Sequence, residues 1–166
     1  GYADITLPSG LGNVQKGHGR AFADFDNDGD LDIVAQMGGA FRADQFYNSL
    51  YENPGFGNHW LAVKLEGRKS NRCAIGVQVR ADFVENGTMR SVYRTVGSGG
   101  SFGANPLRVH IGLGKAERVE TLEVSWPTTG KKQVFRDLPV NQLLHIVEDS
   151  DKPKVIDLKP VKLGKE

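Results

Sequence analysis

Short stretches that alternate apolar and polar residues recur along most of this chain, and helical periodicity is almost absent. A period of two residues is typical of strands with one buried face. In residues 75–83 every second side chain is apolar, and Asn86-Gly87, a strong hairpin signal, follows soon after. The 21 glycines indicate frequent tight turns and therefore short strands. The sequence predicts an all-β protein, a sandwich or barrel with mostly antiparallel pairing.

About ten segments have this strand-like character, at the spacing expected of such folds. The expected strands cover residues 21–23, 31–35, 45–52, 60–65, 75–83, 88–96, 107–111, 119–126, 133–135 and 143–147. Pro127 ends the strand before it, because proline has no amide hydrogen to continue a ladder. After Glu148 the alternation stops. The lysines and prolines of residues 150–166 predict a semi-extended tail or linker.

Composition excludes several classes of protein. The net charge of +1 argues against a nucleic-acid partner. The apolar runs are only a few residues long, so we expect no transmembrane segment. A single cysteine, Cys73, excludes an internal disulfide and a cysteine-based zinc site. The length of 166 residues suits one ordinary domain or two small ones.

The segment most informative about chemistry is the acidic stretch of residues 24–32. Its five carboxylates belong to Asp24, Asp26, Asp28, Asp30 and Asp32. Two carboxylates about 4 Å apart repel by about 1 kcal/mol even in water, so a loop that gathers several needs a cation. Alternate oxygen ligands with a glycine at the turn are typical of calcium loops. The spacing predicts carboxylate ligands at every position except Asp30, which would bind through its backbone carbonyl.

A helix–loop–helix calcium hand does not fit this segment. Its twelfth position requires a bidentate Glu, and Ala35 stands there. Strand-like residues flank the loop where helices would be needed, so we expect a calcium loop within a β-hairpin. Magnesium suits the site less well, since it prefers fewer carboxylates and retained waters. The alternative is a solvated acidic turn that binds no metal.

Two parts of the sequence resemble known families. GRAFADFDNDGDLDI at residues 19–33 resembles an FG-GAP (VCBS-type) repeat, the blade unit of integrin-like β-propellers. The rest of the chain is similar to the ASPIC/UnbV domain, which usually follows such repeats. The matching segments are NHWL at 58–61, SNRCAIGV at 70–77, HIGLG at 110–114, VSWP at 124–127 and NQ at 141–142.

These resemblances divide the chain into an FG-GAP-like blade unit with the calcium loop (residues 1–56), an ASPIC/UnbV-like antiparallel β-sandwich (57–149) and the tail (150–166). They imply a calcium-stabilised protein that is extracellular, periplasmic or at the cell surface, often linked to adhesion, with no known catalytic activity. Because a closed propeller needs several blades, they also imply the C-terminal part of a larger propeller protein. An unpaired blade strand at residues 45–51 would favour packing on the sandwich or self-association.

The functional hypothesis is a calcium-binding, non-catalytic recognition or structural module, whose partner would be a protein or a glycan. One alternative is a carbohydrate-binding module, with Trp60 or Trp126 as a stacking platform, although core packing is the commoner role of such residues. A second alternative is an accessory domain of a hydrolase. No spacing of acidic residues, histidines or Cys73 identifies a catalytic pair, so we expect no enzyme activity.

Overall fold

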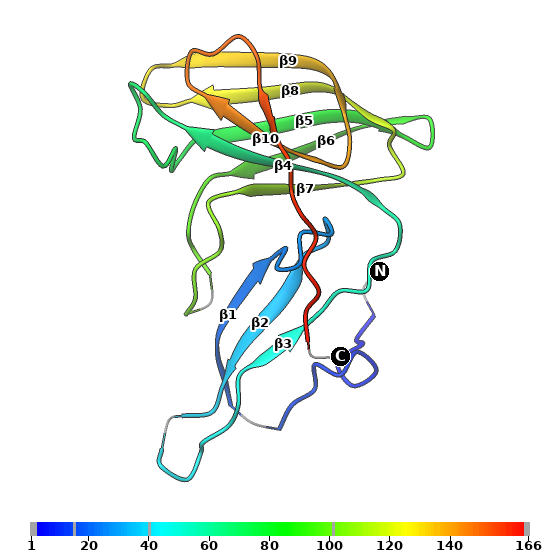
Figure 1. Ribbon diagram of the computed structural model, residues 1–166, viewed down its shortest axis with the longest axis vertical. Coiled ribbons are helices and arrows are strands. Elements are labelled where there is room, and N and C mark those ends of the chain that lie inside the picture. Colours follow the sequence, from blue (N-terminus) through cyan, green and yellow to red (C-terminus); the bar gives the residue numbers. More distant parts are fainter. Residues whose placement is uncertain (1–2, 15, 40, 101, 165–166) are drawn as a thin grey trace.

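The computed structural model describes residues 3–14, 16–39, 41–100 and 102–164 (Figure 1). Within these ranges the regular structure is entirely β. The strands are β1 (Gly17–Ala23), β2 (Asp32–Met37), β3 (Ser49–Tyr51), β4 (His59–Glu66), β5 (Gln78–Glu85), β6 (Thr88–Thr95), β7 (Val109–Gly114), β8 (Arg118–Trp126), β9 (Lys131–Pro139), β10 (Gln142–Val147) and β11 (Lys154–Ile156). No helix of the described residues is long and apolar enough to cross a membrane.

The strands form three sheets. β1, β2 and β3 make a small antiparallel sheet, which we call the blade. The other two sheets have the strand orders β11-β10-β4-β7 and β6-β5-β8-β9, and they pack face to face as a sandwich. Figure 1 shows the sandwich at one end of the molecule and the blade at the other. The predicted class, an all-β protein with an antiparallel sandwich preceded by a blade-like hairpin unit, is confirmed.

One strand pair departs from the expected antiparallel pattern. β10 lies parallel to β4, with Leu144 opposite Val63 and Ile146 opposite Leu65. Parallel neighbours need a long crossover connection. Here five strands, β5 to β9, lie between the two in the chain, so no hairpin constrains their direction.

The core lies between the two sandwich sheets and follows the alternation of the sequence. In β5, Val79, Ala81 and Phe83 are buried, as the period of two predicts. Each fully buried aliphatic side chain contributes about 1.5–3 kcal/mol relative to exposure. The largest members that are fully buried are Trp126, Phe83, Leu61, Ile111, Leu113, Leu122, Leu144 and Ile146.

Ile75 is an exception to that alternation. It was expected on the same face as Val77, but it is 50% exposed. β5 begins only at Gln78, and Ala74 has a φ of 56°, which turns the chain before the strand. The Asn71 side chain holds this turn, since its amide donates to the Ile75 carbonyl (2.9 Å) and its oxygen accepts the Ile75 amide (2.8 Å).

The C-terminal segment is more ordered than the predicted tail. Residues 154–156 form β11 and pair with β10. The chain then returns toward the blade, where the Val161 backbone amide donates to the Asp26 carbonyl (2.7 Å) and the Asn27 side-chain amide donates to the Lys159 carbonyl (3.1 Å). In Figure 1 this segment, drawn in red, runs from the sandwich to the side of the blade. We call residues 157–164 the strap.

Candidate metal centre

The acidic stretch forms the loop of the β1–β2 hairpin, which we call the aspartate loop (residues 24–31). β1 and β2 pair in register from Arg20 to Ala23, so both ends of the loop are held by a ladder. Two residues have positive φ, Asn27 (60°) and Gly29 (100°), and they turn the chain within the loop. A left-handed conformation favours glycine and asparagine. The sequence therefore has residues that adopt a positive φ at low cost at the two positions where the chain reverses.

The aspartate loop brings three carboxylates together. One oxygen from each of Asp24, Asp26 and Asp28 lies within 4.8 Å of the others. Asp24 and Asp26 are buried, whereas Asp28 is exposed. Amides within the loop support the arrangement: the Asp28 amide donates to Asp26 (3.2 Å) and the Asp30 amide donates to Asp28 (2.8 Å). These three side chains present a set of oxygen donors on one side of the loop.

Asp24 is the most unusual member of this cluster. Its side chain is 0% exposed, and neither carboxylate oxygen has a hydrogen-bond partner in good geometry. The Arg108 guanidinium donates to the Asp24 carbonyl (3.3 Å) and lies 3.7 Å from one carboxylate oxygen. Burial raises the pKa of Asp24, and the Arg108 charge and the nearby backbone of Gly29 and Asn27 only partly oppose this. A buried carboxylate without donors is costly unless another cation compensates for it.

The neighbouring carboxyl groups show the same tendency. Burial is the largest cause that raises the pKa of Asp26, and the charges of Asp28, Asp32 and Asp24 add to it. For Asp30, burial is again the main cause, followed by the charges of Asp28 and Asp32. Because the carboxylates repel one another, a bound cation would stabilise their ionised forms and the loop that holds them.

Asp30 and Asp32 occupy different surroundings from the cluster. Asp32 is 1% exposed, and its carboxylate accepts the amides of Phe25 (3.0 Å) and Asn53 (2.8 Å). It thereby ties the aspartate loop to the segment that follows β3. Asp30 is half-buried, with its side chain near Gly55. The predicted ligand roles of these two residues stay predictions.

The aspartate loop also contacts the sandwich through Trp60 at the start of β4. A Cβ atom on Gly29 would lie 1.8 Å from the Trp60 indole nitrogen, so only glycine fits there. The Trp60 ring in turn stacks on His110, with ring centroids 5.7 Å apart and planes at 16°. Burial and the nearby Arg108 charge lower the pKa of His110 to about 4, so this imidazole is neutral at pH 7.

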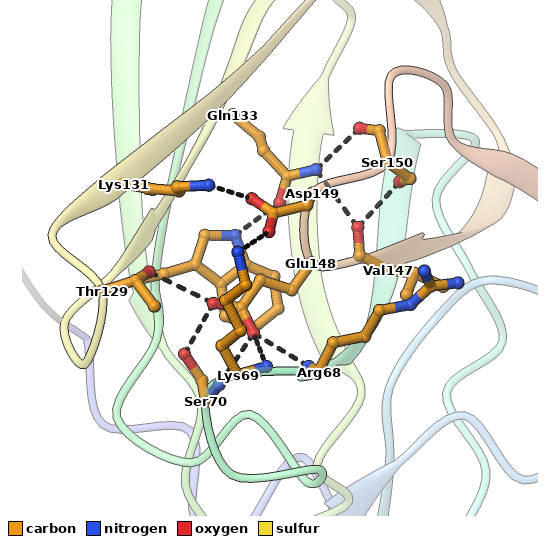
Figure 2. Close-up of polar contacts among 11 residues, drawn as sticks. Arg68, Lys69, Ser70, Thr129, Lys131, Gln133, Val147, Glu148, Asp149 and Ser150 are labelled. Atoms are coloured by element: carbon orange, nitrogen blue, oxygen red, sulfur yellow. Dashed lines mark hydrogen bonds and ion pairs between the residues drawn. The ribbon is translucent and has the colours of Figure 1, made fainter.

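A second buried carboxylate, Glu148, provides a contrast with Asp24 (Figure 2). One of its oxygens accepts the amides of Arg68 (2.8 Å), Lys69 (2.7 Å) and Ser70 (2.8 Å). The other accepts the hydroxyls of Ser70 (2.9 Å) and Thr129 (3.1 Å). Burial alone would raise the pKa of Glu148, but these hydrogen bonds outweigh it and lower the pKa to about 2. Sequence reasoning missed this residue, since most of its donors are about 80 positions away, Thr129 is 19 away, and no motif marks it.

The structure also places the three other side chains that the sequence analysis considered for a ligand or catalytic role. Trp126 is 1% exposed and donates its indole N–H to Gln133 (2.5 Å), so it belongs to the core and offers no ring face to a ligand. Cys73 is an exposed free thiol. Trp60 is only half-buried and lines a cavity beside the aspartate loop.

Together these features describe an all-β sandwich module with an acidic hairpin loop docked against it. Residues 67–153 match the family described as ASPIC and UnbV, and the chain belongs to this family. It is also similar to cartilage acidic protein 1 of Mus musculus and of Homo sapiens, with 30% identity over 152 residues in each case. The alignment covers 90% of this chain but 22% of each relative, so the chain spans about a fifth of their length.

Proposed function

We propose that this chain is a calcium-binding, non-catalytic recognition or structural module of a secreted or cell-surface protein. The buried Asp24 carboxylate carries the proposal: it has no hydrogen-bond partner, yet it lies within 4.8 Å of the carboxylates of Asp26 and Asp28. The same chain gives the buried carboxylate of Glu148 five donor contacts. Arg108 and the backbone of Gly29 and Asn27 compensate the Asp24 charge only in part, and a divalent cation would supply the rest.

The donor set favours calcium. All three clustered side chains offer carboxylate oxygens, which suit a hard cation that accepts six to eight oxygen ligands. Asp24, Asp26 and Asp28 would hold the ion, and Asp30 and Asp32 are the further ligands that the spacing predicts. We place residues 1–56 with FG-GAP-type blade units on the basis of this loop and its strand flanks.

The role of calcium in this proposal is mechanical. The aspartate loop contacts the sandwich through Trp60 and Arg108, and it contacts the strap through Asp26 and Asn27. An ion that neutralises the clustered carboxylates would rigidify the loop and so fix how the blade joins the sandwich. The expected affinity is about 0.1–1 mM, as in other extracellular modules.

A non-catalytic role agrees with the state of the buried titratable groups. Glu148 is fully engaged by donors, and His110 is held neutral against Trp60. An accessory role beside a hydrolase domain is compatible with the same module. The mouse and human relatives are named after cartilage, which supports an extracellular location. A periplasmic or cell-surface location and a role in adhesion belong to the same proposal. A protein or a glycan is the proposed partner.

Calorimetric titration of calcium into chelator-treated protein tests the proposal. We expect saturable binding that is lost in Asp26→Asn and retained in Asp151→Asn, an exposed aspartate outside the loop. Calcium should also raise the melting temperature of the wild type and of Asp151→Asn only. Absence of both the heat and the thermal shift in the wild type would contradict the proposal.

A further inference from the structure

A cavity of about 500 Å³ lies where the aspartate loop, the start of β4 and the residues after β10 come together. Asp28 and Asp30 line it from the loop, Asn58 and Trp60 from the approach to β4, and residues 155–158 from the C-terminal side. This volume falls in the range of small-molecule sites. Residues 141–143 complete the lining, so four segments that are distant in the sequence build the cavity.

Several polar groups that line this cavity are free to bind a ligand. Within the described part of the chain, no hydrogen bond engages the carboxylates of Asp30 and Asp157, the side-chain amide of Asn58 or the indole N–H of Trp60. Carboxylates accept hydrogen bonds, an indole donates one, and a primary amide does both. Such a mixture suits a ligand with many hydroxyl groups, since each hydroxyl is both donor and acceptor.

Trp60 adds an apolar surface to these polar groups. His110 stacks on one face of its ring, Gly29 lies against its indole nitrogen, and the residue is part of the cavity lining. Leu143 and Val155 contribute further apolar walls. The C–H groups of a pyranose pack well against aromatic and aliphatic side chains while its hydroxyls form hydrogen bonds. The arrangement thus places apolar groups beside hydrogen-bonding groups.

We propose that this cavity binds a neutral saccharide unit of a glycan. The carboxylates of Asp30 and Asp157 would repel an anionic sugar. A simple cation would leave the Asn58 amide and the Trp60 ring unused. The site goes beyond the calcium-binding function, because its Asn58, Trp60 and Asp157 groups are separate from the clustered carboxylates.

NMR titration of the full chain with neutral trisaccharides of glucose, galactose, mannose and N-acetylglucosamine tests this inference. We expect at least one of them to shift the Trp60 indole and Asn58 side-chain amide signals, with a Kd of about 1 mM and near-saturation at about 10 mM. Asn58→Ala and Asp157→Ala should each weaken binding at least tenfold. The matched control Asp151→Ala, another exposed carboxylate after β10, should leave the affinity unchanged.

Two outcomes would overturn the inference: no localised shift with any of the neutral sugars, or shifts at the cavity with cationic glucosamine alone. Equal losses in Asp157→Ala and Asp151→Ala would do the same, since they would indicate a diffuse charge effect. The titration is run both with calcium and with chelator, and binding in either condition supports the cavity. Calcium binding itself is judged separately by calorimetry, so the two proposals can fail independently.

Discussion

Asp24 and Glu148 show two ways in which a folded chain can bury a carboxylate. Around Glu148, three consecutive amides of residues 68–70 converge on one oxygen, and two hydroxyls bind the other. Around Asp24, no donor completes a hydrogen bond to either oxygen. Hydrogen bonds to a charged group favour its ionised form, whereas burial without them disfavours it. The two residues therefore have opposite expected effects on stability.

Replacement of Glu148 by Gln should destabilise the protein strongly near neutral pH. The pKa of Glu148 falls from 4.5 to about 2 in the folded state, which corresponds to about 3 kcal/mol. Because the folded pKa is lowered, this stabilisation is present above pH 4.5 and is lost as the pH falls through about 2. Urea unfolding at pH 7 and at pH 2 to 3 measures the difference between wild type and variant, which should shrink in acid.

The matched control for this prediction is Glu117→Gln, at an exposed position. Its free energy of unfolding should stay within about 0.5 kcal/mol of the wild type at both pH values. An equal loss in the two variants would show that the contacts of Glu148 do not stabilise the fold.

Replacement of Asp24 by Asn should raise or lower the melting temperature depending on whether calcium is present. In chelator, the neutral amide removes a buried charge that lacks donors, so the melting temperature should rise. In saturating calcium, the variant should gain nothing from the ion, and the wild type should become the more stable of the two. Thermal unfolding of both proteins in the two conditions measures this crossover. A variant that is less stable than the wild type in chelator would contradict the argument.

At the level of elements, the contact between the aspartate loop and β4 depends on the absence of a side chain at position 29. Gly29→Ala would place a methyl group 1.8 Å from the Trp60 indole nitrogen and would also require alanine at a φ of 100°. Positive φ alone costs about 1–2 kcal/mol for a residue with a Cβ, and the clash adds about 1–3 kcal/mol. We expect a clear loss in urea unfolding and a change in near-ultraviolet circular dichroism.

Gly87→Ala separates the two contributions to that loss. Gly87 also has positive φ (75°), but nothing lies within 4 Å of an added Cβ. It should therefore show only the conformational cost. If the two variants lose the same free energy of unfolding, the packing of Gly29 under Trp60 does not stabilise the junction.

The strap provides a second prediction at this level. Its Val161 amide donates to the Asp26 carbonyl within the aspartate loop (2.7 Å). If calcium rigidifies that loop, hydrogen exchange of residues 157–164 should slow when calcium is added, because local opening of the contact becomes rarer. The amides of β8, which is remote from the loop, should change little. Equal exchange of the strap with and without calcium would indicate that the loop and the strap are not coupled.

The elements also show how far local sequence patterns lead. Period-two alternation is a property of neighbouring residues, so it predicted most of the sandwich strands and the buried face of β5. The pairing of β10 with β4 depends on residues 81 positions apart, and no local pattern encodes its direction. The sequence pattern did not predict β11, because Val155 and Ile156 are only two apolar residues within a lysine- and proline-rich segment. The spacing of the aspartates predicted five metal ligands; three of these side chains, Asp24, Asp26 and Asp28, lie together, and the ligand roles stay predictions. The spacing did not predict the contacts of Asp32 or the cavity beside Trp60.

At the scale of the whole molecule, the blade has an edge strand that no other described strand pairs with, and it exposes apolar side chains. The β1 edge is met by the sandwich, since the Phe22 amide donates to the Asn105 side chain (3.0 Å). Among the described residues no strand pairs with the outer edge of β3, whose Leu50 is 47% exposed. Phe25, two residues after β1, and Phe56, five residues after β3, are also exposed. The mouse and human relatives are about four times as long as this chain.

We therefore expect this chain alone to self-associate through the blade. Light scattering should show an increase in mean mass with concentration, and Leu50→Lys should abolish it by placing a charge on the edge strand. Val134→Lys is the matched control, since Val134 in β9 of the sandwich is 45% exposed. A wild type that stays monomeric at all concentrations would contradict the expectation.

The positions of the two tryptophans have a practical consequence. Trp126 is sealed in the sandwich, whereas Trp60 touches both the aspartate loop and the cavity. Fluorescence emission from Trp126 should stay constant while the fold is intact, so any change in intensity or wavelength on adding an ion or a sugar arises at Trp60. The protein thus contains its own optical reporter at the junction of blade and sandwich, with no label required.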